Sequence, residues 1–182
     1  MSLELVKIAK DDLEQIMHWR MKPEVTKYMY TDPVLTLEIQ EKWFDSIKND
    51  TSVKYWMIKI DGVKIGVINL RDIDYINRRC TWGYYIGDNS FRGRGIASTL
   101  ECNIYDYVFN ILNLNKFWCE VFSFNEKVIS IHERFGSIIE GTLKQHIYKN
   151  GEFFDIVMMA ITKDRWEEIK DNYSYEKIYI EE

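Results

Sequence analysis

Residues 90–97 read Ser-Phe-Arg-Gly-Arg-Gly-Ile-Ala, and this stretch decides how the rest of the chain is interpreted. The preceding segment, residues 80–86, is aromatic and β-branched, which predicts a strand. Apolar residues then recur every three or four positions, which predicts a helix with one buried face. That face carries Leu100, Ile104, Tyr107, Val108 and Ile111. Because a helix N-terminus exposes free amides and a positive dipole end, this strand, basic turn and helix start predict a pyrophosphate site.

Two common phosphate-binding loops do not fit this turn. A P-loop ends in Gly-Lys-Ser/Thr, which Arg94 and its successors do not supply, and the dinucleotide-binding fingerprint needs three glycines at other spacings. The turn instead reads Arg-x-x-Gly-x-Ala, with Arg92, Gly95 and Ala97 at the fixed positions. In this it resembles the coenzyme A pyrophosphate loop of the GCN5-related N-acetyltransferases. The alternative is a glycine-containing turn that only starts a helix.

A second segment, residues 125–136, extends the resemblance. It reads Asn-Glu-Lys-Val-Ile-Ser-Ile-His-Glu-Arg-Phe-Gly, where the family has Asn-x-x-Ala-x-x-x-Tyr-x-Lys-x-Gly-Phe after its fifth strand. Val128 stands at the alanine position, Arg134 at the lysine position, and His132 at the tyrosine position. Ser137 replaces the final phenylalanine. With both motifs present in the right order, the chain resembles the family over nearly its whole length.

The elements predicted along the chain fit this resemblance. They are a strand, two helices, a hairpin, a strand, a helix, a strand, a helix and a second hairpin. Asp61-Gly62 and Asn150-Gly151 are typical two-residue hairpin turns, Asp11 and Thr36 are suited to cap the first two helices, and Gly136 is suited to end a later one. The order predicts a single α/β domain over residues 1–182, with a mixed, mostly antiparallel central sheet flanked by helices. That is the fold which the resemblance implies.

The resemblance implies acetyl-CoA as cosubstrate and no metal. Its pantetheine arm and acetyl carbonyl would be held by backbone groups around Tyr85, Ile86 and Gly87. The pyrophosphate would bind the amides of residues 92–97, which are Arg92, Gly93, Arg94, Gly95, Ile96 and Ala97. Asn125 would contact the pantetheine arm, and Ser130 belongs to the same cofactor-binding set.

The implied reaction is direct transfer, in which an amine attacks the thioester carbonyl and the thiolate leaves. The family's tyrosine protonates that thiolate, and a protonated His132 could do the same. Alternatively, neutral His132 takes a proton from the amine, or only hydrogen-bonds the cofactor or a neighbour. Family members often carry a strand glutamate that deprotonates the amine, but Thr81 stands there. Glu120 and Asp155 are the candidates for that role, and a solvated or salt-bridged carboxylate is the alternative for each.

The acceptor amine is left open between subfamilies. Trp19-Arg20-x-x-Pro23-Glu24-Val25 resembles the UDP-4-amino-sugar N-acetyltransferases of pseudaminic acid synthesis, so we expect such a nucleotide-linked amino sugar first. Arg20 would then bind its diphosphate, unless it forms only a surface ion pair. Residues 74–79 and 111–116 instead resemble the spermidine/spermine N-acetyltransferases. Enzymes that acetylate ribosomal-protein N-termini, or a catalytically inactive protein that binds coenzyme A, are further alternatives.

Composition limits the possible partners. The net charge of −5 and the pI of about 5.4 argue against a general nucleic-acid binder. No apolar run is long enough for a membrane span, so we expect a cytoplasmic protein that acts on a small-molecule amine. The three cysteines, an odd number without a C-x-x-C motif, predict neither a disulfide framework nor a zinc site. Aromatic residues and the tail from Tyr173 to Glu182 could support a homo-oligomer.

Overall fold

The computed structural model describes residues 2–91 and 95–182, and the chain divides into two compact units. Unit 1 comprises residues 2–73, 82–91 and 178–182, and unit 2 comprises residues 74–81 and 95–177. Strand β4 (Arg79–Ile86) contributes its first three residues to unit 2 and the others to unit 1. The single domain expected over residues 1–182 stays a prediction.

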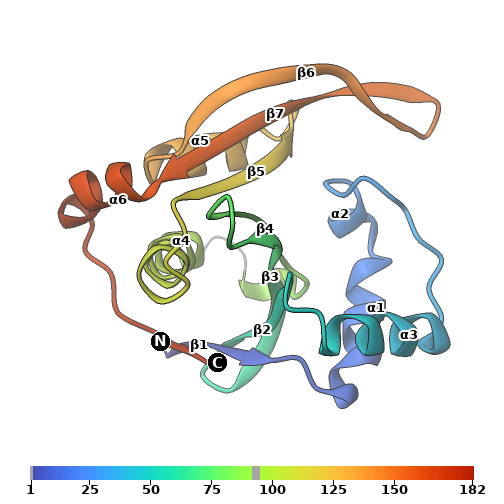
Figure 1. Ribbon diagram of the computed structural model, residues 1–182. Coiled ribbons are helices and arrows are strands. Elements are labelled where there is room, and N and C mark those ends of the chain that lie inside the picture. The colour runs from blue at the N-terminus through green and yellow to red at the C-terminus, as the bar shows by residue number, and fades with distance from the viewer. Residues whose placement is uncertain (1, 92–94) are drawn as a thin grey trace. The chain divides into compact units, whose positions relative to one another are not determined.

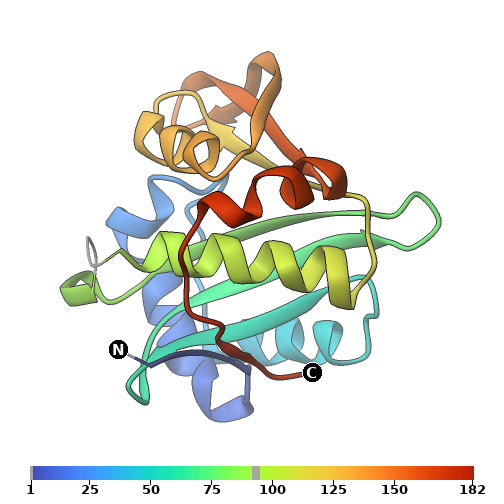
Figure 2. The same ribbon diagram turned by 90° about the vertical axis from the view of Figure 1, so that its left-hand side faces the viewer.

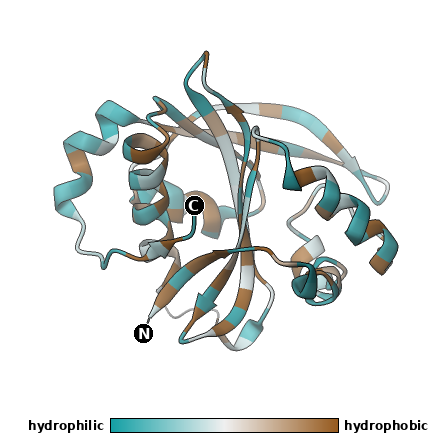
Figure 3. Ribbon diagram, turned by 60° about the horizontal axis from the view of Figure 1, so that its bottom comes forward, coloured by the Kyte–Doolittle hydropathy of each residue, from teal (hydrophilic) through white to brown (hydrophobic). Residues whose placement is uncertain are grey.

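Unit 1 is built around β1 (Leu3–Lys7), β2 (Lys54–Ile60) and β3 (Val63–Asp74). β1 pairs antiparallel with β2, and β2 with β3. The two-residue strand β8 (Tyr179–Ile180) runs parallel to β1, so the C-terminus lies beside the first strand (Figure 2). Hydrophobic stretches alternate with hydrophilic ones along these strands (Figure 3), as expected where one face is buried.

The helices of unit 1 are α1 (Leu13–Arg20), α2 (Pro23–Thr26) and α3 (Leu37–Lys48), together with the 3-10 turns η1 (Lys10–Asp12) and η2 (Asn89–Phe91). α1 and α3 lie side by side (Figure 1). α1 turns Leu13, Ile16 and Trp19 inward at helical spacing, where they pack with Met57 and Val67 of the strands. This packing fixes the end of α1, and with it Arg20.

Unit 2 contains the start of β4, β5 (Lys116–Phe122), β6 (Ile138–Lys149) and β7 (Glu152–Thr162). Arg79 to Thr81 of β4 pair parallel with β5, while β5 and β6 each pair antiparallel with β7. The helices are α4 (Ile96–Asp106), the π-turn η3 (Tyr107–Ile111), α5 (Glu126–Arg134), α6 (Lys163–Ile169) and the 3-10 turn η4 (Lys170–Asn172). Figure 1 labels α4, α5 and α6 and the strands β4 to β7.

The core of unit 2 is aromatic. The fully buried Tyr105 ring on α4 packs edge-on against Phe117 of β5 and Trp166 of α6, with ring centroids 5.7 and 5.2 Å apart. Edge-to-face packing at this separation is favourable for aromatic rings. It holds one face of α4 against β5, so the polar side chains on that face are fixed in the interior.

The predicted α/β fold class and mostly antiparallel pairing are confirmed. Of the strand pairs described above, β1 with β8 and β4 with β5 run parallel, and the other four run antiparallel. Both predicted hairpin turns are confirmed as well, because Asp61 and Gly62 have φ of 50° and 80°, and Asn150 and Gly151 have 53° and 86°. A type I′ turn requires positive φ at both positions.

Two local predictions were wrong. Ile111 was expected on the buried helical face but is 61% exposed, because η3 follows α4 and the wider π-turn rotates the later residues. Asp11 was expected to cap the first helix. Instead, the Asp12 carboxylate accepts the Ala9 amide at 2.8 Å, in a 3-10 turn that precedes α1.

Candidate active site

The N-terminus of α4 carries the described part of the predicted pyrophosphate site. Gly95 is the residue before the helix and has φ of +76°, a left-handed conformation that favours glycine. A Cβ built on Gly95 would meet no atom of another described residue within 4 Å. Ile96 and Ala97 form the first turn, whose amide groups point along the helix axis toward its start. Arg92, Gly93 and Arg94 lie outside the described residues.

His132 lies in the interior of unit 2, on α5. It is 4% exposed, and its Nδ1 lies 2.7 Å from Oε1 of Glu101 on α4. The Cys119 thiol of β5 also interacts with the ring. Three elements therefore meet at this imidazole, and α4, α5 and β5 each contribute a side chain that can carry or share a charge.

Two opposing effects act on the imidazole of His132. Burial by itself lowers the pKa, because it penalises the charged form. The Glu101 carboxylate outweighs this effect, together with the Cys119 thiol, and raises the pKa of His132 to about 10. The ring is therefore an imidazolium at neutral pH, with a carboxylate as its counterion.

Glu101 is itself fully buried and has a second partner. The Tyr105 hydroxyl donates to Oε2 of Glu101 at 2.6 Å and lies 3.2 Å from the Ser137 hydroxyl. Both oxygens of the carboxylate are thus engaged. Burial and the Glu101 charge raise the pKa of the Tyr105 phenol, which keeps it a hydrogen-bond donor.

Sequence reasoning missed Glu101 and Tyr105. A signal was present, since Glu101 and Tyr105 each directly follow an apolar residue of the stripe predicted to be buried, and they lie four positions apart. Four positions is about one helical turn, which brings an acidic and a hydroxyl side chain together at the edge of that stripe. The polar Ser137 in place of the family's phenylalanine pointed to the same interior spot.

The other predicted residues of unit 2 lie on or near its surface. Asn125 begins α5, where its carbonyl accepts the Val128 amide at 3.0 Å, and its side chain forms no capping bond. Ser130 of α5 and Glu120 of β5 are exposed. Asp155 accepts Lys144 Nζ and the Gln145 amide, each at 2.8 Å, and these hydrogen bonds lower its pKa. Asp155 therefore has the salt-bridged environment that was its alternative interpretation.

In unit 1, Gly87 is held on both sides of its backbone. Its amide donates to the Ile65 carbonyl at 2.8 Å, and its carbonyl accepts Lys22 Nζ at 3.0 Å. A Cβ on Gly87 would lie 2.3 Å from the Trp19 ring, so glycine is required by packing. Tyr85 and Ile86 precede it in β4, and both are partly buried.

Arg20 and Tyr85 carry polar atoms with no partner among the described residues. Nη1 of Arg20 and the Tyr85 hydroxyl are both buried and form no hydrogen bond within that part of the chain. Arg20 also forms no ion pair with a carboxylate of the described residues. Burial raises the pKa of the Tyr85 phenol, and the Arg20 charge opposes this only in part. A buried donor without a partner is costly, which makes this end of α1 a candidate for contact with an acceptor group.

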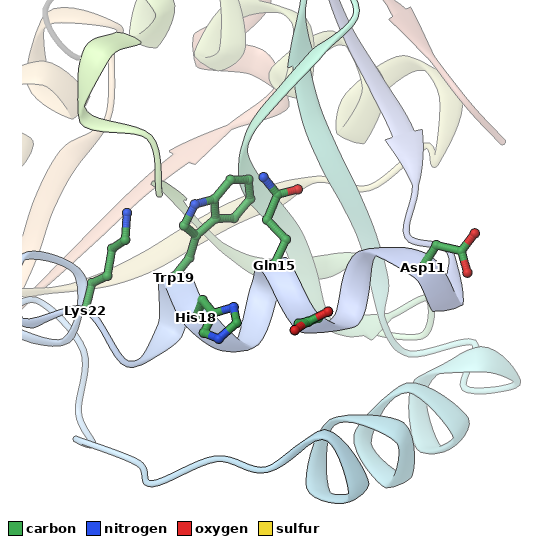
Figure 4. Close-up of a pocket in the computed structure, with 6 residues that line it drawn as sticks. Asp11, Gln15, His18, Trp19 and Lys22 are labelled. Carbon is green, nitrogen blue, oxygen red and sulfur yellow. The ribbon is translucent and has the colours of Figure 1, made fainter.

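A hollow of about 410 Å³ lies along α1 in unit 1 (Figure 4). Its lining consists of Asp11, Glu14, Gln15, His18, Trp19 and Lys22. In Figure 4 the Trp19 ring points toward the strands and His18 points away from them. None of the residues predicted for catalysis or cofactor binding lines this hollow, but two of its lining residues, Trp19 and Lys22, lie against Gly87.

No group of three His, Cys, Asp or Glu side chains among the described residues could hold a metal ion. In the part of the chain that the structure describes, no helix combines the length and apolar character of a membrane span.

The chain resembles several known proteins. A family model described as an acetyltransferase (GNAT) domain matches residues 2–138. The spermidine N(1)-acetyltransferase of Escherichia coli K12 is 26% identical over 165 residues, which cover 91% of this chain and 88% of that protein. The L-amino acid N-acetyltransferase of the same strain is 28% identical and covers 84% of this chain and 93% of that protein.

Solved structures agree with this. The spermidine N-acetyltransferase of Vibrio cholerae, in complex with CoA and spermine, superposes with a TM-score of 0.86 at 26% identity. The match covers 91% of this chain and 98% of that chain.

Proposed function

The chain belongs to the acetyltransferase (GNAT) family, and we propose that it acetylates a polyamine such as spermidine, using acetyl-CoA. Membership of this family makes the chain an acetyl-CoA-dependent N-acetyltransferase. The spermidine acetyltransferases among its relatives support a polyamine as the acceptor. The observation that carries the proposal is that a spermidine acetyltransferase matches 91% of this chain, in sequence and in structure. The amino sugar expected from the Trp19-Arg20 motif becomes the second candidate.

The residues of the predicted cosubstrate site fit a pyrophosphate. The first turn of the eleven-residue helix α4 offers amide donors and a positive dipole end, and no other described residue would meet a Cβ built on Gly95 within 4 Å. Acetyl-CoA, when bound, supplies the activated acetyl thioester. We assign to Gly95, Ile96 and Ala97 the binding of its pyrophosphate, together with Arg92, Gly93 and Arg94 as expected from the sequence.

His132 is proposed as the acid of the reaction. Glu101 raises the pKa of His132 to about 10, so the imidazole carries a proton at neutral pH that it can give to a leaving thiolate. A neutral imidazole could not act in this way. The alternative role, in which His132 takes a proton from the amine, is disfavoured by the same carboxylate. We leave the deprotonation of the amine to water or Glu120, because Asp155 is already ion-paired.

One observation favours the second candidate. Arg20 is a half-buried cation, and Nη1 has no partner among the described residues. A polyamine would bring further positive charge, whereas a phosphate or carboxylate on the acceptor would pair with the guanidinium. The amino acid acetylated by one relative carries such a carboxylate. An acceptor that joins an amine to an anionic group, such as the expected UDP-4-amino sugar, is therefore kept.

The charge of the acceptor separates the two candidates. Turnover of spermidine and of a UDP-4-amino sugar would be measured for the wild type, for Arg20→Gln and for Arg165→Gln. Arg165 is an exposed arginine paired with Glu168 and serves as the matched control. The leading proposal predicts spermidine turnover that Arg20→Gln does not reduce. Turnover restricted to the sugar nucleotide, with KM raised at least about tenfold in Arg20→Gln alone, would establish the second candidate instead.

We also propose a cytoplasmic location. Cys80, Cys102 and Cys119 are all buried, and among the described residues none of them forms a disulfide, which is typical of a reducing compartment. The expected homo-oligomer stays a prediction, which the elution volume of the purified protein would test.

A further inference from the structure

Unit 2 buries a connected set of polar side chains that the proposed acid alone does not explain. Glu101 and Tyr105 on α4 are fully buried, and Ser137, which follows α5, is 8% exposed. The Glu101 carboxylate faces His132 and accepts the Tyr105 hydroxyl, which in turn lies 3.2 Å from the Ser137 hydroxyl. The resemblance assigns no role to a residue at position 101.

Stability alone is a weak reason for such an arrangement. Removing a carboxylate and an imidazole from water costs several kcal/mol per ion, and well-packed apolar residues in place of a buried ion pair are often equally stable or more stable. The Glu101–His132 pair has good geometry, with 2.7 Å between Oε1 and Nδ1 and a second donor on Oε2. A buried pair in which every oxygen is engaged fixes the orientation of the ring.

The groups that face His132 come from two packed elements. Glu101 and Tyr105 approach from α4, and Cys119 approaches from β5. Cys102, the neighbour of Glu101, is buried, and its burial raises the thiol pKa to about 12, so it stays neutral. Glu101 is thus the carboxylate that these contacts place against the imidazole ring, 2.7 Å from Nδ1.

We propose that Glu101 is a positioning residue for acyl transfer: its carboxylate accepts Nδ1–H of His132, fixes the ring and balances its charge. This inference rests on the proposed role of His132 as the acid. With Nδ1 held, the proton that moves is the one on Nε2. As the bond between the amine nitrogen and the acetyl carbon forms and the C–S bond breaks, the Nε2 proton passes to sulfur. The proton lost by the amine then returns the ring to its starting state.

The test is Glu101→Gln, which keeps the shape and removes the charge. Its matched control is Glu140→Gln, an exposed glutamate of the same unit that is paired with Lys116. For Glu101→Gln we expect kcat to fall at least tenfold, KM for acetyl-CoA to stay within twofold, and the alkaline limb of the kcat profile to move to lower pH. Glu140→Gln should match the wild type. Glu101→Asp, the conservative variant, should recover part of kcat.

A second readout does not depend on activity. The chain has only three histidines, His18, His132 and His146, so NMR titration of the imidazoles can assign His132 by substitution of the other two. We expect its midpoint to move toward 6.5 in Glu101→Gln and to stay in Tyr105→Phe, which keeps the ion pair. An unchanged midpoint, or a shifted midpoint with wild-type kcat and pH profile, would overturn the proposal.

Failure of the function is distinguishable from failure of this inference. If the wild type turns over neither a polyamine nor an anionic amine, the proposed function fails, whatever the variants do. If the wild type is active and Glu101→Gln loses activity only in proportion to its folded fraction, Glu101 is structural and the inference fails.

Discussion

At the scale of the residue, the exchange of tyrosine for histidine is meaningful only with its partner. A phenol needs no counterion to remain protonated at neutral pH, because its ordinary pKa is near 10. An imidazole does need one, and here Glu101 brings the pKa of His132 to about 10. The pair thereby gives a histidine the acidity that the family's tyrosine has intrinsically. A histidine at this position therefore requires the buried carboxylate of Glu101, which a tyrosine would not.

The same pair predicts how stability depends on pH. The pKa of His132 is raised in the folded state to about 10 from an unfolded value of about 6.5. The folded state therefore holds its proton more tightly, so the pair's stabilisation is complete below about pH 6.5 and is lost as pH rises toward 10. We expect the free energy of unfolding to fall over this window by up to about 1.4 kcal/mol per pH unit.

Urea unfolding between pH 6 and 10 would check this slope. His132→Gln should lack this contribution to the slope, whereas His146→Gln, at an exposed position, should keep it. Equal slopes in the wild type and His132→Gln would mean that the imidazolium is not held by the fold.

At the scale of the element, two glycines with the same backbone conformation allow the start of α4 to be compared with a hairpin turn. Gly95 and Gly62 both have left-handed backbone, with φ of +76° and +80°, and a Cβ on either meets no other described residue within 4 Å. Glutamate at either position should cost a similar amount, roughly 1–2 kcal/mol. They differ only in place, one at the start of α4 and one in the β2–β3 turn.

Gly95→Glu should therefore abolish acetyl-CoA binding, because it puts bulk and negative charge at the positive end of the helix. Gly62→Glu should bind acetyl-CoA normally in calorimetric titration. Wild-type affinity in folded Gly95→Glu would remove the assignment of the pyrophosphate to this helix start.

Strand glycines give a second comparison within unit 1. A Cβ on Gly66 of β3 would lie 2.1 Å from the Tyr85 carbonyl oxygen, whereas a Cβ on Gly83 of β4 would meet nothing within 4 Å. Gly66→Ala must push β3 and β4 apart locally, so we expect a loss of about 2 kcal/mol or more in the free energy of unfolding. Gly83→Ala should stay within about 0.5 kcal/mol of the wild type or exceed it. Thermal unfolding of both variants would decide this, and similar values would show that the close approach is not a constraint.

Elements with local signals were predictable, and those without were not. The two hairpins follow from Asp61-Gly62 and Asn150-Gly151, since few residues other than glycine, asparagine and aspartate adopt their backbone readily. β8 has two residues and exists only because β1 offers it an edge, which no local pattern reveals. The residues before the Asn150-Gly151 turn predict a strand only over residues 146–148, but β6 begins at Ile138, because register shifts along it interrupt the alternation that marks a strand.

The candidate site was also predictable only in part. A motif that binds a ligand through its backbone can be recognised in the sequence, and so the helix start at Gly95 was located. The surroundings of His132 could not be predicted, because Glu101 and Cys119 lie on other elements of the fold. Long-range pairs of this kind are set by tertiary packing.

At the scale of the whole molecule, the family assigns the reaction and the acceptor stays a proposal. The family model matches residues 2–138, and a spermidine acetyltransferase matches 91% of the chain. The chain's net charge of −5 is compatible with a cationic acceptor. Arg20, whose buried Nη1 has no partner among the described residues, would instead favour an anionic group on the acceptor. Charge on the acceptor is thus the property that distinguishes the two candidates.

The most direct test of the account is release of free thiol from acetyl-CoA by the purified wild type, with spermidine as the acceptor. We predict thiol release that depends on spermidine and saturates with it, together with a melting temperature that rises with acetyl-CoA concentration. Acetyl-CoA that raises the melting temperature but is not consumed with spermidine, a UDP-4-amino sugar or an amino acid would contradict the account.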